Sequence, residues 1–122
     1  MALNEQFIEA CKTGDLNSVR EIYMLNPTID ISANGEEAFI EACANGHLEV
    51  IRQLYQWKPI IDISAQDEYA FRWACENGHL EIVRQLYEWK PTIHISAQYE
   101  QAFIYACSNG YLEVIRQLYE WK

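Results

Sequence analysis

Four cysteines recur at one fixed spacing, and thiols in a regular pattern suggest either disulfide bonds or zinc binding. They are Cys11, Cys43, Cys75 and Cys107, each 32 residues after the one before. A disulfide requires Cα atoms within about 7 Å, and a zinc ion requires several ligands around one point. Equivalent positions of successive stacked helices lie roughly 10 Å apart, which is too far for either chemistry. We therefore predict small buried core residues with free thiols.

The histidines do not form a catalytic arrangement. His47 and His79 occupy one position of the repeated pattern, where Asp15 and Tyr111 stand in the other copies, and His94 stands alone in a predicted loop. No nucleophile or carboxylate pair lies at a useful spacing, and no Gly-rich phosphate loop, paired C-x-x-C or H-E-x-x-H is present. We predict a protein that is not an enzyme, with no catalytic residue, cofactor or metal site, and with structural histidines at helix starts.

The cysteine spacing belongs to a repeat that runs through the whole chain. Glycine, tyrosine and proline recur with the same period of 32 residues: Gly14, Gly46, Gly78 and Gly110; Tyr23, Tyr55, Tyr87 and Tyr119; Pro27, Pro59 and Pro91. A fixed period of this length indicates stacked units that cover one another's apolar faces. We predict a single domain over 1–122, with repeats 1–34, 35–66, 67–98 and 99–122.

The spacing of apolar residues predicts two helices in each repeat. Apolar residues of the first helix share one side of it, as in the second repeat: Ala38, Phe39, Ala42 and Cys43. Gly46 ends this helix, because glycine adopts the left-handed conformation without a Cβ penalty. A second helix over about 47–57 stops before Pro59. An extended segment, 60–65, then leads to a polar tip at 66–68. The predicted fold is all-α, a helix-turn-helix-loop solenoid of four stacked repeats with a hairpin-like loop in each.

The turn between the helices carries a family resemblance. The segment Ala42–Ile51 reads A-C-A-N-G-H-L-E-V-I and resembles the A-A-x-x-G-H-x-x-V-V core of ankyrin repeats, and Ala74–Val83 reads the same way. The resemblance covers all four repeats, from about Leu3 to Lys122. It implies an ankyrin-like solenoid. This variant looks most like the ankyrin arrays of giant amoebal viruses, and an engineered consensus of such repeats would look the same.

The sequence departs from the family pattern in three places. The period is 32 residues, whereas roughly 33 is usual in the family. The T-P-L-H opening is replaced, as in the segment 37–40, so the threonine and histidine hydrogen bonds of that motif cannot be carried over. Lys58-Pro59 and Lys90-Pro91 stand where the family normally has Gly-Ala after the second helix.

Charge and hydropathy limit the possible partners. The net charge is −9, and no lysine- or arginine-rich face is available to bind phosphates, which argues against nucleic acid. The acidic balance favours solubility, or else a basic partner. No stretch approaches the roughly 18 apolar residues of a membrane span, and the first residues do not resemble a signal peptide. We predict an intracellular, cytoplasmic protein that does not enter membranes.

The positions at which repeats two to four differ lie on one stripe of the first helix. Four positions there vary, and on a wheel of about 100° per residue they lie side by side, opposite the core. The loop tips vary as well. Aromatic residues and arginine on such a surface are typical of binding hot spots. We predict a partner-binding face made of these residues: Glu37, Ile40, Glu41, Asp67, Tyr69, Arg72, Trp73, Glu76, Tyr99, Gln101, Ile104 and Tyr105.

The family resemblance implies the same face, because partner proteins of ankyrin repeats usually dock on the first helices and loop tips. The function predicted from the sequence is a noncatalytic protein–protein interaction module. An alternative stays open, in which Trp73 and Tyr105 fill the stack and the chain is a structural or self-assembling scaffold, natural or engineered, with no dedicated partner.

The two ends of the array differ from its middle. The first repeat reads as a polar N-terminal cap, whereas 99–122 reads as a plain internal repeat without a cap. An uncapped layer favours self-association or a longer array. The tryptophans that end the second helices are constant, which predicts packing between repeats, with lysine stems over the rings: Trp57, Trp89 and Trp121.

Overall fold

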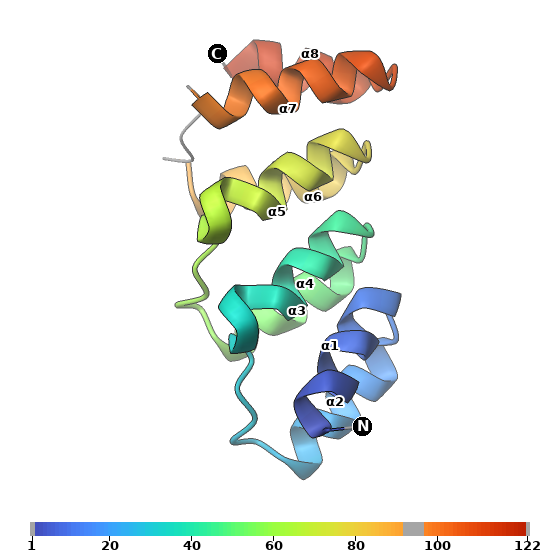
Figure 1. Ribbon diagram of the computed structural model, residues 1–122, viewed down its shortest axis with the longest axis vertical. Coiled ribbons are helices and arrows are strands. Elements are labelled where there is room, and N and C mark those ends of the chain that lie inside the picture. The colour runs from blue at the N-terminus through green and yellow to red at the C-terminus, as the bar shows by residue number, and fades with distance from the viewer. Residues whose placement is uncertain (1, 92–96, 122) are drawn as a thin grey trace. The chain divides into compact units, whose positions relative to one another are not determined.

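The computed structural model describes residues 2–91 and 97–121, without the side chains of residues 67 and 97–99. Over this range the chain forms eight helices and no strand: α1 (Leu3–Thr13), α2 (Leu16–Leu25), α3 (Ala33–Ala44), α4 (Leu48–Trp57), α5 (Ala65–Glu76), α6 (Leu80–Trp89), α7 (Ala97–Ser108) and α8 (Leu112–Trp121) (Figure 1). Two compact units, Met1–Asp62 and Ile63–Lys122, each contain four of these helices. The all-α prediction is confirmed, and a single domain stays a prediction.

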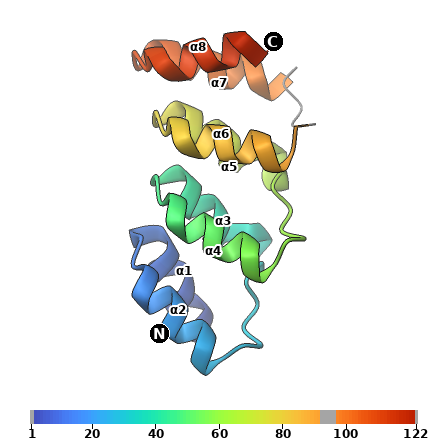
Figure 2. The same cartoon turned by 180° about the vertical axis from the view of Figure 1, so that it is seen from behind.

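Each unit has two layers of helices. In the unit Met1–Asp62 the first helices of the two repeats, α1 and α3, pack on each other, and the second helices, α2 and α4, form the other layer (Figures 1 and 2). The unit Ile63–Lys122 has the same arrangement, with α5 on α7 and α6 on α8. Every first helix also packs on the second helix of its own repeat. One face of each first helix is therefore left outside the core.

The core lies between the two layers and consists of the apolar residues that recur in the repeats. Phe39 of α3 and Phe71 of α5 occupy the same repeat position and are 0% and 1% exposed. The second helices contribute one apolar side each, such as Val50, Ile51 and Leu54 of α4, which are at most 1% exposed. Burial of these side chains removes apolar surface from water and is the main favourable term for each unit.

A glycine follows the end of each first helix. At Gly14 both a left-handed φ and a close neighbouring side chain favour a residue without a Cβ. Gly14 ends α1 at φ 79°, and its N–H donates to the carbonyls of Ala10 and Cys11. A Cβ built on Gly14 would lie 2.4 Å from Nδ1 of His47, which immediately precedes α4. In the other unit the ring of Tyr111 lies against Gly78 in the same way, at 2.6 Å from such a Cβ. The position shared by His47 and Tyr111 is therefore a packing position between repeats.

The starts of α3 and α5 differ from the prediction. Asn34, Gly35 and Glu36 form a left-handed turn inside the range of α3, with φ of 56°, 65° and 69°. Gln66 and Glu68 adopt the same conformation in α5. The predicted extended segment with a polar tip at 66–68 is therefore wrong, because these residues coil tightly before the right-handed helix begins. The predicted repeat boundaries at 34/35 and 66/67 fall inside these turns.

The loops after α4 and α6 are held by the lysine that precedes the proline. Lys58 Nζ donates to Ser32 Oγ of the preceding repeat, and Lys90 Nζ donates to Ser64 Oγ. Both links join residues 26 apart within one unit. The lysine of each Lys-Pro pair, which departs from the family pattern, thus anchors the end of α4 to the start of α3 and the end of α6 to the start of α5.

Candidate functional site

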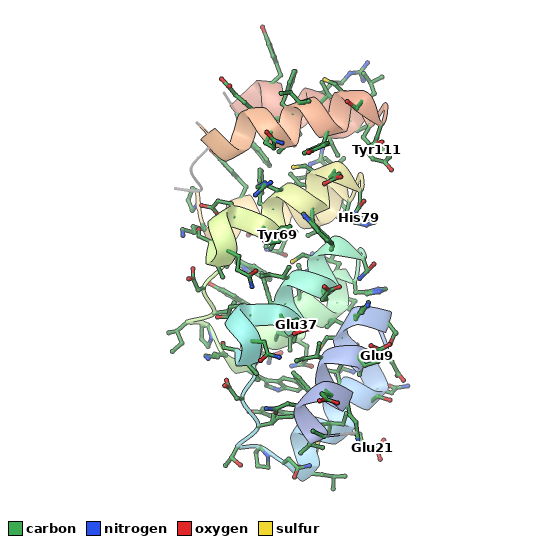
Figure 3. The ribbon with its side chains drawn as sticks, viewed as in Figure 1. Glu9, Glu21, Glu37, Tyr69, His79 and Tyr111 are labelled. Carbon is green, nitrogen blue, oxygen red and sulfur yellow. The ribbon has the colours of Figure 1, made fainter. Side chains whose placement is uncertain are left out.

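The most concentrated side-chain cluster on the predicted face lies on α5, and we call Tyr69, Arg72 and Trp73 the aromatic cluster. The rings of Tyr69 and Trp73 meet edge to face, with centroids 4.7 Å apart and planes at 83°. The guanidinium carbon of Arg72 lies 5.6 Å from the centroid of the Tyr69 ring, within cation–π range. All three side chains are half-buried, and Figure 3 labels Tyr69 on α5. The sequence prediction thus placed together residues that do touch.

Arg72 differs from the arginines of α4, α6 and α8. Arg52, Arg84 and Arg116 each form an ion pair with the glutamate three residues earlier, at 3.1, 3.3 and 3.1 Å. Over the described range no such pair involves Arg72, and its Nε is buried without a hydrogen-bond partner. A buried, unpaired donor carries a desolvation cost that a partner molecule is able to remove.

The neighbouring first helix, α7, extends the cluster within the same unit. Gln101 Nε2 donates to the Tyr105 hydroxyl across 3.2 Å, and both side chains are half-buried. Ile104 lies between them in sequence and is 56% exposed. The side chains of Asp67 and Tyr99, which were also predicted to belong to the face, lie outside the described part of the structure.

The equivalent face of α3 is acidic. Glu37 and Glu41 are half-buried, and Glu37 accepts a hydrogen bond from Asn34 Nδ2 at 3.1 Å (Figure 3). Ile40 was expected to be exposed, but it is only 7% exposed. On the helical wheel Ile40 lies about 60° from the core residue Cys43, at the border of the stripe, so its apolar side chain follows the buried face. The expected exposure of Ile40 is therefore corrected.

Glu76 ends α5 on the same stripe and takes part in the contact between repeats. Its side chain is half-buried, and its carbonyl accepts a hydrogen bond from Asn109 Nδ2 at 3.1 Å. The end of α5 is therefore tied to the turn after α7. This link adds to the packing of α5 on α7.

The constant residues of the second helices hold repeats together within each unit. Trp57 stacks on Tyr23 with centroids 3.8 Å apart, and Trp121 stacks on Tyr87 at 4.0 Å. Arg20 Nε donates to Gln53 at 2.9 Å, and Arg84 Nε donates to Gln117 at 2.8 Å. Packing of Trp57 and Trp121 between repeats is confirmed, and the ring that each stacks on is a tyrosine. Constancy along the repeats thus marks structural positions.

One structural residue escaped the sequence reasoning. Glu36 is 6% exposed, and its Oε2 accepts the backbone N–H of Asp62 at 2.8 Å, while its Oε1 has no hydrogen-bond partner in the described residues. Glu68 occupies the same position in α5 and is also 6% exposed. The signal was present, because repeats two to four all carry glutamate here, at Glu36, Glu68 and Glu100, between positions that vary.

The thiols are free, as predicted, but they are not all buried. Cys11, Cys43 and Cys75 are buried, whereas Cys107 is exposed. Burial raises the pKa of the Cys11 thiol to about 12, and it raises the pKa of Cys43 and of Cys75 above the usual range. The expectation for Cys107 is wrong because that residue lies on a side of α7 that neither α5 nor α8 covers.

A thiol-specific reagent is therefore expected to modify Cys107 rapidly and the three buried thiols only when the chain unfolds. The thiolate is the nucleophile, so a raised pKa and loss of access both slow the reaction of Cys11, Cys43 and Cys75. Labelling with an aromatic disulfide reagent, followed by absorbance in buffer and in denaturant, measures this. The Cys107→Ser variant must lose the rapid phase, and a rapid phase that survives would contradict the placement.

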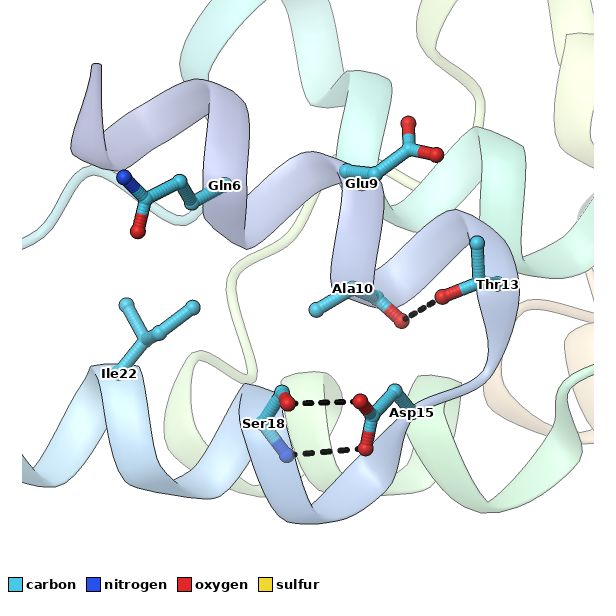
Figure 4. Close-up of a pocket in the computed structure, with 7 residues that line it drawn as sticks. All are labelled: Gln6, Glu9, Ala10, Thr13, Asp15, Ser18 and Ile22. Atoms are coloured by element: carbon cyan, nitrogen blue, oxygen red, sulfur yellow. Dashed lines mark hydrogen bonds between the residues drawn. The ribbon is translucent and has the colours of Figure 1, made fainter. Parts of the chain in front are cut away.

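The hollowed surface between α1 and α2 does not offer a second site. It is an open groove of about 320 Å³ lined by Gln6, Glu9, Ala10, Thr13, Asp15, Ser18 and Ile22 (Figure 4). Asp15 caps α2 by accepting from Ser18 N at 3.2 Å and from Ser18 Oγ at 2.7 Å, and Thr13 Oγ1 donates to the Ala10 carbonyl at 3.3 Å. The Ser18 hydrogen bonds lower the pKa of Asp15. The polar groups of Thr13, Asp15 and Ser18 in this groove therefore stabilise the helix ends.

The described residues offer neither a metal site nor a membrane span. They contain no group of three or more histidine, cysteine, aspartate or glutamate residues that would hold a metal ion. None of their helices combines the length and apolarity that crossing a bilayer demands.

Paired helices in two layers, with constant residues joining the repeats and variable residues outside, define a helical repeat protein. The family model described as ankyrin repeats (3 copies) matches residues 7–99 and 61–122, so the chain belongs to the ankyrin repeat family. This confirms the resemblance and the ankyrin solenoid fold, while the likeness to giant-virus arrays stays a prediction. Ankyrin repeats generally mediate protein–protein interaction and are typically not enzymes.

A solved structure is similar over nearly the whole chain. It is an ankyrin repeat family protein from Legionella pneumophila, with 32% identity and a TM-score of 0.88 over 97% of this chain. The chain spans 36% of the length of that protein. No curated protein matches the sequence.

Proposed function

We propose that this chain is a noncatalytic module that binds a protein partner through the exposed side of its first helices and the adjoining loop tips. The aromatic cluster on α5 is the single observation that carries the proposal. Two large rings and a guanidinium touch one another on a surface outside the core, where a monomer gains little from them. Gln101, Ile104 and Tyr105 on α7 continue the surface in the same unit.

The composition of this surface favours a protein partner over other ligands. Tyrosine, tryptophan and arginine provide large contact areas with little loss of side-chain freedom, and they dominate measured binding hot spots. The edge-to-face contact of Tyr69 and Trp73 holds both rings in place before binding. Glu76 on α5 and the tip positions Asp67 and Tyr99 belong to the proposed face in the same unit, and Glu37 and Glu41 on α3 belong to the corresponding surface of the other unit. A cytoplasmic location accords with this function.

The double variant Trp73→Ala, Tyr105→Ala tests the proposal. We expect its free energy of unfolding to fall by less than about 2 kcal/mol, because both rings are half-buried and their edge contacts contribute roughly 0.5 to 1.5 kcal/mol. Chemical denaturation measures this. Peptides selected from a random displayed library with the whole chain should then bind the double variant at least about tenfold more weakly.

Phe71→Ala is the matched control on the same helix, because Phe71 is 1% exposed and belongs to the core. It should destabilise the chain far more than the double variant does. If the double variant loses as much stability as Phe71→Ala, Trp73 and Tyr105 are structural and the proposed face is wrong. Selected peptides that bind the double variant with unchanged affinity would also contradict the proposal.

Self-association is the second candidate, and one observation favours it. Several large apolar side chains of the last repeat are exposed: Ile104 at 56%, Tyr111 at 37%, Leu112 at 54% and Tyr119 at 73%. Met24, Leu25 and Ile60 are exposed elsewhere, but the last repeat carries four such side chains, and exposed apolar surface favours association of copies. Sedimentation velocity of the whole chain and of the double variant, over a series of concentrations, distinguishes a binding module that remains a monomer from a self-assembling scaffold.

A further inference from the structure

Arg72 is a positive charge that the described part of the chain does not neutralise. The second-helix arginines Arg52, Arg84 and Arg116 have glutamates within 3.3 Å. The guanidinium of Arg72 lies over the Tyr69 ring, and its Nε is buried without a hydrogen-bond partner in the described residues. Arg20 has no ion pair in the described residues either, but its Nε donates to Gln53, so Arg72 is the one arginine there whose Nε is both buried and without a hydrogen-bond partner.

The position of Arg72 indicates which kind of group would pair with it. Its side chain is half-buried beside two rings, so part of the guanidinium has already lost water. A carboxylate on a partner would accept charge-assisted hydrogen bonds from it, and the planar fork of arginine allows two such bonds in parallel. Placement next to aromatic rings would exclude water from that pair and strengthen it.

We infer that Arg72 is the specificity-determining residue of the proposed face, and that it recognises one acidic side chain, aspartate or glutamate, flanked by apolar residues in a protein segment. This inference rests on the proposed function and adds the chemistry of the partner to it. The partner is a segment that continues past the acidic residue on both sides, because Tyr69 precedes Arg72 along α5 and Trp73 follows it, and each offers ring surface to a neighbouring apolar side chain.

The surrounding charges restrict the partner further. Glu76 follows Arg72 by one helical turn, and the chain as a whole carries an excess of acidic groups. A run of acidic residues would be repelled by this field, whereas a single carboxylate placed on Arg72 is not. The recognised pattern is therefore one acidic residue between apolar residues, and not an acidic tract.

Selection from a library of random peptides, displayed inside a carrier loop with both ends fixed, tests this inference with the whole chain. The selected peptides should share one aspartate or glutamate next to aromatic or aliphatic residues. Their synthetic versions should bind Arg72→Gln about 30-fold more weakly or worse, and Arg72→Lys should recover only part of the loss because lysine lacks the planar fork. Changing the acidic residue of the peptide to its amide should cost wild type the same factor and cost Arg72→Gln little.

Arg52→Gln is the matched control, since it removes the same charge from the exposed pair with Glu49 on a second helix. It should leave peptide affinity unchanged. Peptides that lose affinity on Trp73→Ala but lack an acidic residue and ignore Arg72→Gln would overturn this inference and leave the proposed function standing. Peptides that ignore both variants, or a library that yields no binder, would overturn both. A carboxylate recognised only at a free chain end, in a library displayed with free C-termini, would overturn the choice of a side chain.

Discussion

Phe39→Ala is expected to lower the free energy of unfolding by about 3 to 5 kcal/mol. Phe39 is 0% exposed in α3, between the two layers of its unit. Alanine would remove the transfer free energy of the ring and leave a cavity that α1 and α4 cannot fill without moving. Urea or guanidinium denaturation followed by circular dichroism measures the change.

Phe103→Ala is the matched control for this prediction. Phe103 stands in the same repeat position on α7, yet it is partly exposed. Its truncation should therefore cost clearly less than that of Phe39. Equal losses at the two positions would mean that burial between the layers does not set the cost.

Gly14→Ala is expected to cost about 2 to 5 kcal/mol, from two separate effects. The φ of 79° at Gly14 is unfavourable for any residue with a Cβ, and the new methyl would lie 2.4 Å from the His47 ring. Gly110→Ala separates the two effects, because Gly110 has φ 72° but a Cβ there meets nothing within 4 Å. It should cost only the conformational part, about 1 to 2 kcal/mol.

A double-mutant cycle with His47→Ala completes this test. Removal of the ring should make the Gly14→Ala cost fall to that of Gly110→Ala, because only the conformational part remains. If Gly14→Ala costs the same with and without His47, the ring simply moves aside. The close approach between the repeats would then have no energetic role.

The sequence was enough to predict the helices. Their apolar periodicity shows where they run, and local residues show where they end. Gly14 and Gly46 stop the first helices, and the predicted second helix over 47–57 agrees with α4 at Leu48–Trp57. The core was predictable for the same reason, because a wheel shows which side of a helix is apolar. The touching pair of Tyr69 and Trp73 followed from their spacing of four residues.

The remaining features depend on contacts that local sequence does not reveal. A polar triplet such as 66–68 resembles a loop tip when it is taken alone, and only the glutamate shared by repeats two to four marks Glu68, which is buried in a left-handed turn, as a structural position. The wheel also treats the border of a helix face as outside, so the burial of Ile40 was missed. The error at Cys107 was the opposite one. Burial was predicted there, but the residue is exposed, because equivalent repeat positions are covered unequally in the structure.

The links between repeats have a consequence for how the chain reaches this structure. Lys58 and Ser32 are 26 residues apart, and Arg20 and Gln53 are 33 apart, with the same separations for their equivalents in the other unit. Contacts of such short range correspond to a low contact order, which goes with rapid folding. A new repeat is able to pack as soon as its neighbour exists, so we expect the protein to acquire its structure progressively while it is still being translated.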